Sequence, residues 1–365
     1  MNNIWNFFDI DAQNSDAGDN IEIKKEYSRY MKNIKNIAKF DKCLLCGEQC
    51  TSLCNSHTIP QFIMKKLSDN GSFYYINSLI GQPFSKQALG KREAMTFNLI
   101  CNKCDQIYFS TYENPRNYSN CLTQKLLAEV ALKNNLRMLS KRLIEKSFYL
   151  DQLKRNKSSN GDKISFTSFL TFIELDIKEL HKSIKLANDT INGKKNGYYL
   201  IDHITLNYTT KMAYQGKIAL ITGFDNEVIN DIYNSGENYK IQCLHISVFP
   251  VENKTHVFLF IEDGDRRYSK FYKKFRKLSL NDKLKVVNYI IIKYSEDWLL
   301  SSKTEKEFLK SQSLIKEAKS TAMLNIFSDL PYFDEKGLNG EALNRALTDF
   351  SLSNIPEMPN FLLNT

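Results

Sequence analysis

Four cysteines, arranged as two C-x-x-C pairs, are the residues in this sequence best suited to chemistry. Cys43 and Cys46 form the first pair, and Cys101 and Cys104 form the second. Each pair can place two thiolates on one Zn²⁺, and together they supply the four soft ligands of a closed tetrahedral site. The sequence therefore predicts one structural zinc ion held by these four cysteines.

The residues around the pairs favour a treble-clef arrangement. Gly47 directly follows the first pair, where a zinc knuckle needs a tight turn. The residues after Cys104, beginning with Asp105, can start a helix that carries the second pair at its N-terminus. A redox-active dithiol is the other use of a C-x-x-C pair, but the βαβ pattern typical of a thioredoxin-like site is missing here.

Two further cysteines, Cys50 and Cys54, lie between the pairs. They could replace one of the four ligands or be ordinary small residues of a loop, and we favour the loop interpretation. The N-terminus carries no basic, apolar leader, so we expect a cytoplasmic protein. In that reducing compartment clustered cysteines indicate metal binding before disulfides.

A histidine and a carboxylate accompany the cysteines. His57 lies in the run Asn55-Ser56-His57-Thr58-Ile59-Pro60, and Asp105 directly follows the second pair. A neutral imidazole can act as a general base near pH 7, although a single histidine is also commonly structural or a zinc ligand. A carboxylate is a hard oxygen ligand suited to Mg²⁺ or Mn²⁺. Phosphodiester hydrolysis needs both a general base and a divalent cation.

Residues 40 to 115 resemble the HNH (His-Me finger) nuclease superfamily. They are most similar to largely uncharacterised bacterial proteins with the pattern C-x-x-C, Ser-His-x-Ile-Pro, Cys-x-x-Cys-Asp/Glu and a short aromatic-Glu ending. The matching residues are Cys43, Cys46, Ser56, His57, Thr58, Ile59, Pro60, Cys101, Cys104, Asp105, Phe109, Tyr112 and Glu113. The resemblance implies a ββα-metal core with His57 as general base and Asp105 on a catalytic Mg²⁺ or Mn²⁺.

The chain also departs from the pattern of that superfamily. HNH nucleases usually carry Asp or His immediately before the base, where this chain has Ser56, a poor metal ligand. Asp105 stands in place of the last metal-binding histidine. Asn98 is the candidate for the middle Asn that orients the base. Glu113 is either a second metal ligand or a buried partner of a Lys or Arg.

Composition places the chain among globular proteins of two or three domains. Its 365 residues carry 50 Lys and Arg against 41 Asp and Glu, a formal charge of +9, and 42% are hydrophobic. This hydrophobic content excludes a wholly disordered chain, and the lack of a long apolar run argues against a membrane protein. We expect a polar start and basic helix over 1–38, an HNH-like finger over 39–120 and an α+β domain over 121–365.

Apolar spacing predicts the elements that position these residues. Residues 121–190 are expected to be mainly helical, and residues 191–365 to form an antiparallel sheet with helices. The predicted helices cover 22–37, 61–67, 170–188, 226–234, 282–300 and 303–319, with a loop over 154–161. The predicted strands cover 72–76, 198–208, 217–223, 241–250 and 256–262, the last two as a hairpin through 252–254.

Two other features bear on binding. Residues 266–277 interleave Lys and Arg with Tyr and Phe, so the charges could bind phosphates while the rings stack on bases. A solvated helix whose aromatic residues face the core is an equal alternative. His203, His245 and His256 fall on predicted strands and could converge on one face, although positions at the sheet surface or core edge are the simpler interpretation. His181 falls on a predicted helix.

Two functions fit these observations. The first is a metal-dependent HNH-like nuclease that cleaves DNA or RNA, with structural Zn²⁺, catalytic Mg²⁺ or Mn²⁺, and a role such as antiviral defence. The alternative is a non-catalytic zinc-finger protein that binds nucleic acid or a partner protein. A third, weaker hypothesis makes the C-terminal half the functional unit, for example a sensor of a phage protein. None of the three involves a membrane.

Overall fold

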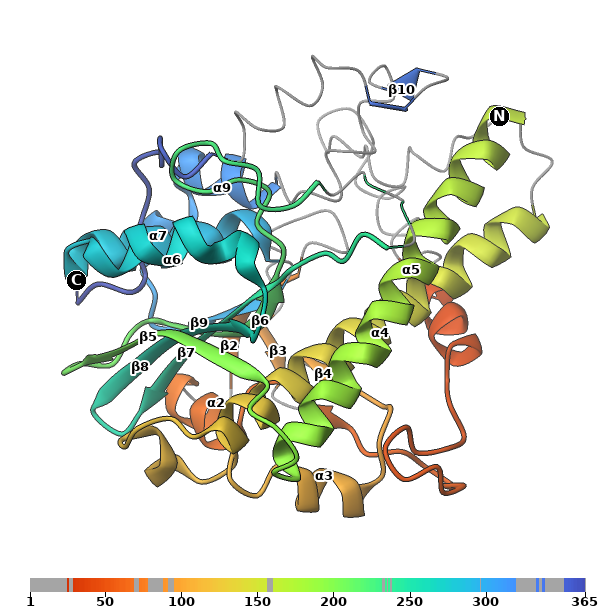
Figure 1. The fold of residues 1–365 in the computed structure, drawn as a ribbon, viewed down its shortest axis with the longest axis horizontal. Helices are drawn as coiled ribbons and strands as arrows, with labels where there is room; N and C mark the ends of the chain where they lie inside the picture. The colour runs from red at the N-terminus through yellow and green to blue at the C-terminus, as the bar shows by residue number, and fades with distance from the viewer. Residues whose placement is uncertain are drawn as a thin grey trace.

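The computed structural model of the chain combines helices with antiparallel sheet, which confirms the expected α+β class (Figure 1). It describes residues 25, 29–68, 72–77, 88–90, 95–155, 160–231, 234, 236, 238–295, 297–319, 333–334, 337–338 and 351–364. Within these ranges no helix is both long and apolar enough to cross a membrane.

A seven-stranded sheet of order β3-β2-β9-β6-β7-β8-β5 lies at the centre, and every pair of neighbouring strands is antiparallel. Its strands are β2 (Ser72–Asn77), β3 (Ala88–Gly90), β5 (Tyr198–Leu206), β6 (Met212–Ile218), β7 (Leu244–Val251), β8 (Lys254–Glu262) and β9 (Asp297–Ser301). Strand β2 pairs with β9 although more than half of the chain separates them. The expected boundary near residue 120 is therefore crossed by one hydrogen-bonded sheet.

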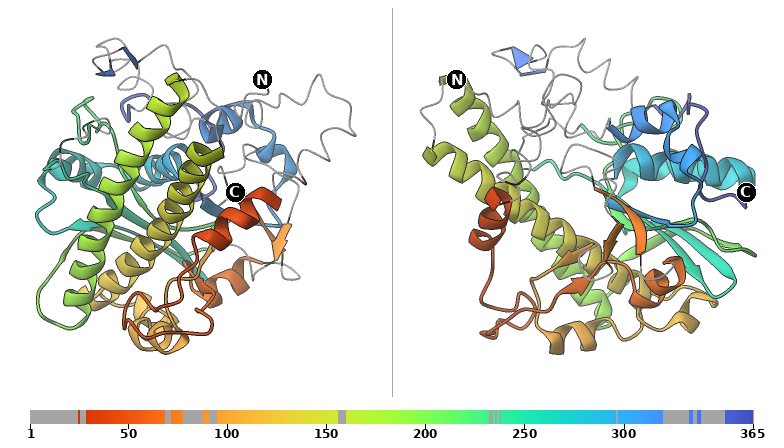
Figure 2. Two further views of the ribbon diagram at one scale, coloured as in Figure 1. Left: turned by 90° about the vertical axis from the view of Figure 1, so that its right-hand side faces the viewer. Right: turned by 180° about the vertical axis from the view of Figure 1, so that it is seen from behind.

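Helices cover both faces of this sheet. The long helices α4 (Gln124–Arg155) and α5 (Asn160–Ile191) lie side by side on one face, and α6 (Ser269–Lys277) and α7 (Leu280–Tyr294) cover the other (Figures 1 and 2). Phe258 and Phe260 of β8 join the hydrophobic cluster on the α4 side. Val257 and Leu259 of the same strand join the cluster on the α7 side. Because both faces are buried, this strand reads as a continuous apolar run.

Smaller elements complete the fold. A second, two-stranded sheet pairs β1 (Ser56–His57) with β4 (Thr96–Phe97). The remaining elements are α2 (Gln61–Leu67), α3 (Asn102–Tyr108), η3 (Pro115–Tyr118), η4 (Arg266–Tyr268), α8 (Lys306–Leu309), α9 (Gln312–Lys319), β10 (Phe333–Asp334) and β11 (Gly337–Leu338).

Several predicted elements are confirmed. The helix over 61–67 and the strand over 72–76 are α2 and β2, and residues 29–37 of the predicted N-terminal helix are helical. The hairpin is also confirmed, since Val251 pairs with Lys254 and leaves only Glu252 and Asn253 in the turn. The helix predicted over 170–188 lies within α5, which extends beyond it at both ends. The loop predicted over 154–161 is too long, because residues 154–155 belong to α4 and residues 160–161 to α5, while residues 156–159 lie outside the described ranges.

The helix predicted over 226–234 is wrong. Asn226 adopts a φ of 57°, in the left-handed region that a right-handed helix cannot contain, and Val228 forms an isolated bridge with Thr222. The Glu227 carboxylate accepts a hydrogen bond from the backbone N–H of Asp225. Local side-chain hydrogen bonds of this kind favour a turn over a helix.

The helix predicted over 282–300 ends early. Helix α7 stops at Tyr294, Ser295 takes an extended conformation, and Trp298 lies in β9 between β2 and β6. A short apolar run fits a doubly covered strand as well as a buried helix, so spacing could not separate the two. The helix predicted over 303–319 is divided into α8 and α9, and the strand predicted over 217–223 lies earlier, as β6.

Candidate zinc centre and the adjoining polar site

The four predicted cysteines come together at one point. The ligand atoms of Cys43, Cys46, Cys101 and Cys104 all lie within 4.8 Å of one another, and the Sγ atoms of Cys46 and Cys101 are 3.9 Å apart. Zinc–sulfur bonds of about 2.3 Å place tetrahedral sulfurs about 3.8 Å apart. The donor set and its spacing therefore fit a structural Zn²⁺.

Local backbone geometry builds this centre. Gly47 has a φ of 74°, as the predicted tight turn requires, and its N–H donates to the Cys43 carbonyl. An isolated bridge between Lys42 and Gln49 closes the loop. Helix α3 begins directly after Cys101, which confirms that the second pair lies at a helix N-terminus.

Backbone N–H groups support the thiolate form that a metal needs. The N–H of Cys101 donates to Cys43 Sγ at 3.3 Å, and the N–H of Cys104 donates to Cys101 Sγ at 3.4 Å. Burial raises the pKa of the Cys43 thiol, but backbone hydrogen bonds from Cys46, Cys101 and Leu45 outweigh it and lower the pKa to about 7.

Cys50 and Cys54 stand outside the four-ligand group. The thiol of Cys50 donates to the Glu48 carbonyl at 3.4 Å, as an ordinary loop residue can. Burial raises the pKa of the Cys54 thiol to about 11, and the nearby Asp105 carboxylate adds to the rise.

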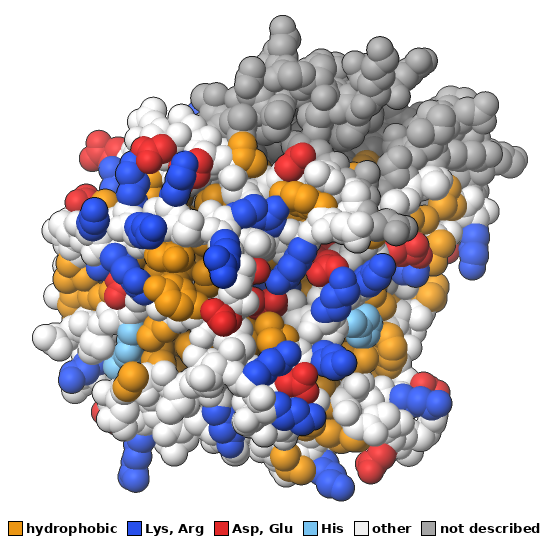
Figure 3. All heavy atoms as spheres, in the orientation of Figure 1, with side chains coloured by type: hydrophobic (Ala, Val, Ile, Leu, Met, Phe, Trp, Pro, Cys, Tyr) orange, Lys and Arg blue, Asp and Glu red, His pale blue; other side chains and the backbone are white. Residues whose placement is uncertain are grey.

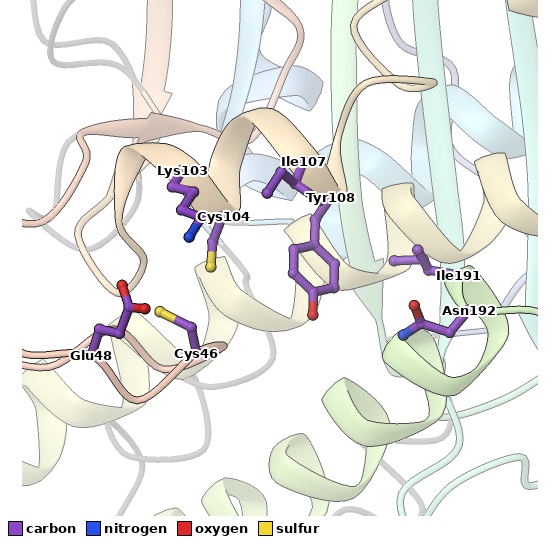
Figure 4. A pocket seen from close by; sticks show the side chains of 8 residues that line it. All are labelled: Cys46, Glu48, Lys103, Cys104, Ile107, Tyr108, Ile191 and Asn192. Carbon is purple, nitrogen blue, oxygen red and sulfur yellow. The ribbon is translucent and has the colours of Figure 1, made fainter.

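A pocket of about 270 Å³ lies beside the zinc centre (Figure 4). Cys46 and Glu48 line it from the loop, and Cys104 and Tyr108 line it from α3. Asn192, just past the end of α5, closes the opposite side. The pocket lies between α3 and α5, and through it solvent can approach one side of the four-cysteine cluster.

His57 lies on β1, paired with Thr96 of β4, and is half-buried. Asn98 follows β4, and its side-chain amide donates to the Cys54 carbonyl at 3.1 Å, just ahead of β1. This hydrogen bond braces the segment that leads into His57. The elements thus follow the order strand, strand, helix, with α3 directly after the second strand.

Asp105 and Ser56 meet across this unit. The Ser56 hydroxyl donates to Asp105 Oδ1 at 2.5 Å, so the residue next to His57 contacts the carboxylate that follows the second cysteine pair. Two motifs separated by more than forty residues in sequence therefore form one site.

Lys133 of α4 is the third member of this site, and sequence reasoning missed it. Its ammonium donates to Ser56 Oγ at 2.7 Å and to Asp105 Oδ1 at 2.8 Å. The Lys133 side chain is only 1% exposed, against 28% for Asp105. The available signal was a lysine inside the apolar run of α4, because lysines are almost never fully buried unless they are paired.

Glu113 lies near this site but outside its hydrogen bonds. Its side chain is exposed and forms no ion pair with a described Lys or Arg, so the choice between a metal ligand and a partner of a cation stays a prediction. Desolvation raises the pKa of its carboxyl group and the Asp105 charge adds to the rise, while Lys133 lowers it.

A divalent cation does not fit at Asp105. The carboxylate already forms a salt bridge with the Lys133 ammonium, and the Ser56 hydroxyl gives its proton to the same oxygen. In the described ranges the four cysteines are the only group of three or more Cys, His, Asp or Glu with metal-binding spacing. The expected catalytic Mg²⁺ or Mn²⁺ site is therefore not supported by these side chains.

The strand histidines share the α4-facing side of the sheet but serve packing. Nε2 of His203 lies 3.2 Å from Nδ1 of His256, and the His245 ring stacks on Phe260. Nδ1 of His245 lies 3.0 Å from the side-chain amide nitrogen of Asn134 on α4. Burial lowers the pKa of His245 to about 3. These rings act as core polar residues.

The structure of residues 266–277 matches the second interpretation given above, a solvated helix whose aromatic residues face the core. Tyr268, Phe271 and Phe275 are fully buried against the core, so none of them can stack on a base. Tyr272 is half-buried and packs against Tyr199. On the face drawn in Figure 3, Lys and Arg side chains are spread among Asp and Glu, without one continuous basic patch.

Comparison with known proteins gives no match to a protein family, to a curated protein or to a solved structure.

Proposed function

We propose that the chain is a nuclease in which His57 is the general base of phosphodiester cleavage. The observation that carries the proposal is the 2.5 Å hydrogen bond from Ser56 to Asp105. It unites the Ser-His motif with the Cys-x-x-Cys-Asp motif, which are the two halves of the HNH resemblance. The order β1, β4, α3 and the zinc centre are consistent with the treble-clef, ββα arrangement of such nucleases.

In this proposal each side chain has a limited task. Neutral His57 accepts the proton of the attacking nucleophile, as imidazole can near pH 7. Asn98 orients the segment before His57 through the Cys54 carbonyl. The zinc ion fixes the loop and α3 relative to each other. No step is assigned to a divalent cation at Asp105, because Lys133 already pairs with that carboxylate.

The test is cleavage of labelled DNA and RNA, single- and double-stranded, by the zinc-loaded protein. We expect His57→Ala to lower the rate by roughly 10²- to 10⁴-fold, the usual contribution of a general base. His181→Ala is the matched control, since His181 is exposed on α5. Cleavage that persists in His57→Ala would show that the assigned base is wrong.

The second candidate is a non-catalytic zinc module that binds nucleic acid or a partner protein. The buried contact of Lys133 with Ser56 and Asp105 favours it, because a closed ion pair can serve packing alone. The same assay separates the two candidates. If the wild-type protein binds every substrate and cleaves none, the nuclease proposal fails and the binding module remains.

A further inference from the structure

Lys133 places a fixed positive charge where the HNH resemblance calls for a metal ion. Ser56 and Asp105 occupy the two positions that would supply ligands to a catalytic cation, before the base and on the helix. Both side chains are instead within 2.8 Å of one ammonium group. We infer that Lys133 takes the place of the divalent cation, so that the proposed nuclease acts without one and its substrate is RNA.

The surroundings of Lys133 hold the ammonium in place. Its Nζ lies 4.0 Å from the centroid of the Phe109 ring, 5.7 Å from that of Tyr112 and 5.9 Å from that of Phe97. Aromatic faces at such distances attract a cation and exclude water. Solvent reaches only 1% of the Lys133 side chain.

This charge opposes a second cation. A metal on the outer oxygen of Asp105 would lie within roughly 5 Å of the ammonium, where two positive charges repel strongly at low effective dielectric. Lys133 also neutralises Asp105, so the carboxylate does not repel an approaching phosphate. Lys133 is therefore a positioning residue. Its ammonium is buried, so it affects the substrate indirectly, by fixing and neutralising Asp105 and by holding Ser56.

The inferred lack of a divalent cation also indicates the substrate class. Without a metal ion there is no metal-activated water to attack the phosphate, so the substrate must supply the nucleophile. RNA carries its own nucleophile, the ribose 2′-hydroxyl, already held beside the phosphorus. Neutral His57 takes the 2′-hydroxyl proton, the 2′-oxygen attacks phosphorus, and the bond from phosphorus to the 5′-oxygen breaks. The leaving oxygen takes a proton from water, and the resulting hydroxide recovers the proton from His57. The products are a 2′,3′-cyclic phosphate and a 5′-hydroxyl.

The first test uses the wild-type protein, in buffer passed over chelating resin, with zinc content measured afterwards. We expect single-stranded RNA to be cleaved at the same rate with and without added Mg²⁺ or Mn²⁺. An RNA with one 2′-deoxyribose should not be cut at that residue. Cleavage that requires the added cation, or cutting of the deoxy site, would overturn the inference while leaving the nuclease proposal intact.

The second test measures metal binding and needs no activity. Titration with Mn²⁺, followed by electron paramagnetic resonance, should detect no Mn²⁺ bound near Asp105 in the wild type. Lys133→Met keeps the length and apolar stem but removes the charge, so it should bind Mn²⁺, and Lys133→Met combined with Asp105→Asn should not. Mn²⁺ should also restore RNA cleavage to Lys133→Met, a change that a merely structural lysine would not produce.

The outcomes separate the two proposals. Mn²⁺ binding by the wild type that Asp105→Asn abolishes would overturn the role of Lys133, whatever the cleavage result. A folded Lys133→Met variant that binds no Mn²⁺ would do the same. If no nucleic acid is cleaved under any condition, the proposed function fails, and with it the assignment of RNA.

Discussion

A buried lysine is costly unless its partners offset the loss of hydration. Lys133 meets this condition with the Asp105 carboxylate, the Ser56 hydroxyl and the Phe109 ring, all supplied by the part of the chain that carries the four cysteines. Removing one member of a buried pair costs more than removing both, because the remaining charge is left without a partner. The pair therefore ties α4 to β1 and α3.

The first prediction tests this coupling. Lys133→Met leaves Asp105 without its partner, and since Asp105 is partly exposed we expect a loss of about 2 kcal/mol in the free energy of unfolding. Adding Asp105→Asn should recover part of that loss. Urea denaturation of the two single variants and the double variant measures the coupling, and strictly additive effects would contradict it.

Glu129 provides a second prediction at this scale, on pH dependence. Burial raises the pKa of its carboxyl to about 7, even though a hydrogen bond from the Tyr112 N–H lowers it. Between pH 4.5 and pH 7 the folded chain keeps a proton that the unfolded chain releases, so this group makes stability fall as pH rises.

Glu129→Gln removes that contribution. From about pH 5 to about pH 8 the wild type should lose roughly 2.5 kcal/mol of unfolding free energy relative to the variant. The half-exposed Lys125 ammonium lies 3.9 Å from Glu129 Oε1 and lowers the pKa of this carboxyl, but by less than burial raises it. Parallel pH profiles of the two proteins would contradict the prediction.

Among the elements, α4 has an unusual environment because its first half is buried on every side. Residues 126–136 are all buried, enclosed by the cysteine-bearing region, α5 and the sheet. A helix buried all round must pair its polar residues. Asn134 Oδ1 accepts from Gln215 of β6 at 2.9 Å, and Asn135 Oδ1 accepts from Lys217 at 3.0 Å.

The same helix connects distant strands further along. Arg137 donates to the Thr96 carbonyl at 2.6 Å and forms a salt bridge with Asp297 at 3.0 Å. Lys141 pairs with the same carboxylate at 2.6 Å. Helix α4 thus holds the small β1–β4 sheet against β9 of the main sheet.

Helix α7 supplies a prediction about a single element. The Ser279 hydroxyl accepts from the Asp282 N–H at 3.2 Å and donates to the Asp282 carboxylate at 2.6 Å. Ser279→Ala should lower the free energy of unfolding by about 1 kcal/mol. Asn281→Ala, at an exposed position of the same helical turn, is the control and should cost nothing. Thermal denaturation measures both, and equal melting temperatures would contradict the assigned cap.

For the molecule as a whole, the four-cysteine cluster lies on one side of a layered structure. One hydrophobic cluster joins the cysteine region to α4, α5 and one sheet face, and a second joins α6 and α7 to the other face. Loss of zinc should therefore loosen the first cluster before the second. Amide exchange is expected to rise in β1, β4 and α3 while β7 and β8 stay protected.

The last prediction assigns the ligands. Wild-type protein should contain one zinc per chain, since four thiolates complete a tetrahedral site. Cys43→Ser should lose this zinc and melt at a lower temperature. Cys50→Ser is the matched control and should keep both zinc content and melting temperature, because Cys50 lies outside the cluster. Zinc loss in the control would contradict the assignment.

The four cysteines of the cluster could be predicted from the sequence, because two C-x-x-C pairs and a following glycine are local signals that can be recognised without knowledge of the rest of the fold. The sequence also determined the β7–β8 hairpin and most of α5, whose patterns are long and periodic. Apolar spacing could not distinguish a helix from a central strand at Trp298, since both bury such a run on all sides. For the same reason it gave no sign that β2 pairs with β9.

Tertiary packing sets the side-chain contacts next to His57. Ser56 and Asp105 looked like an incomplete metal site in the sequence, and the missing charge comes from Lys133 on a helix that follows the motif. A lysine inside an apolar run indicates that the side chain needs a partner but does not say which one, because the partner is fixed by how α4 packs against β1 and α3. The inferred replacement of a divalent cation by Lys133 therefore depends on helix packing, whereas each cysteine pair of the candidate zinc centre is recognisable from its own local sequence.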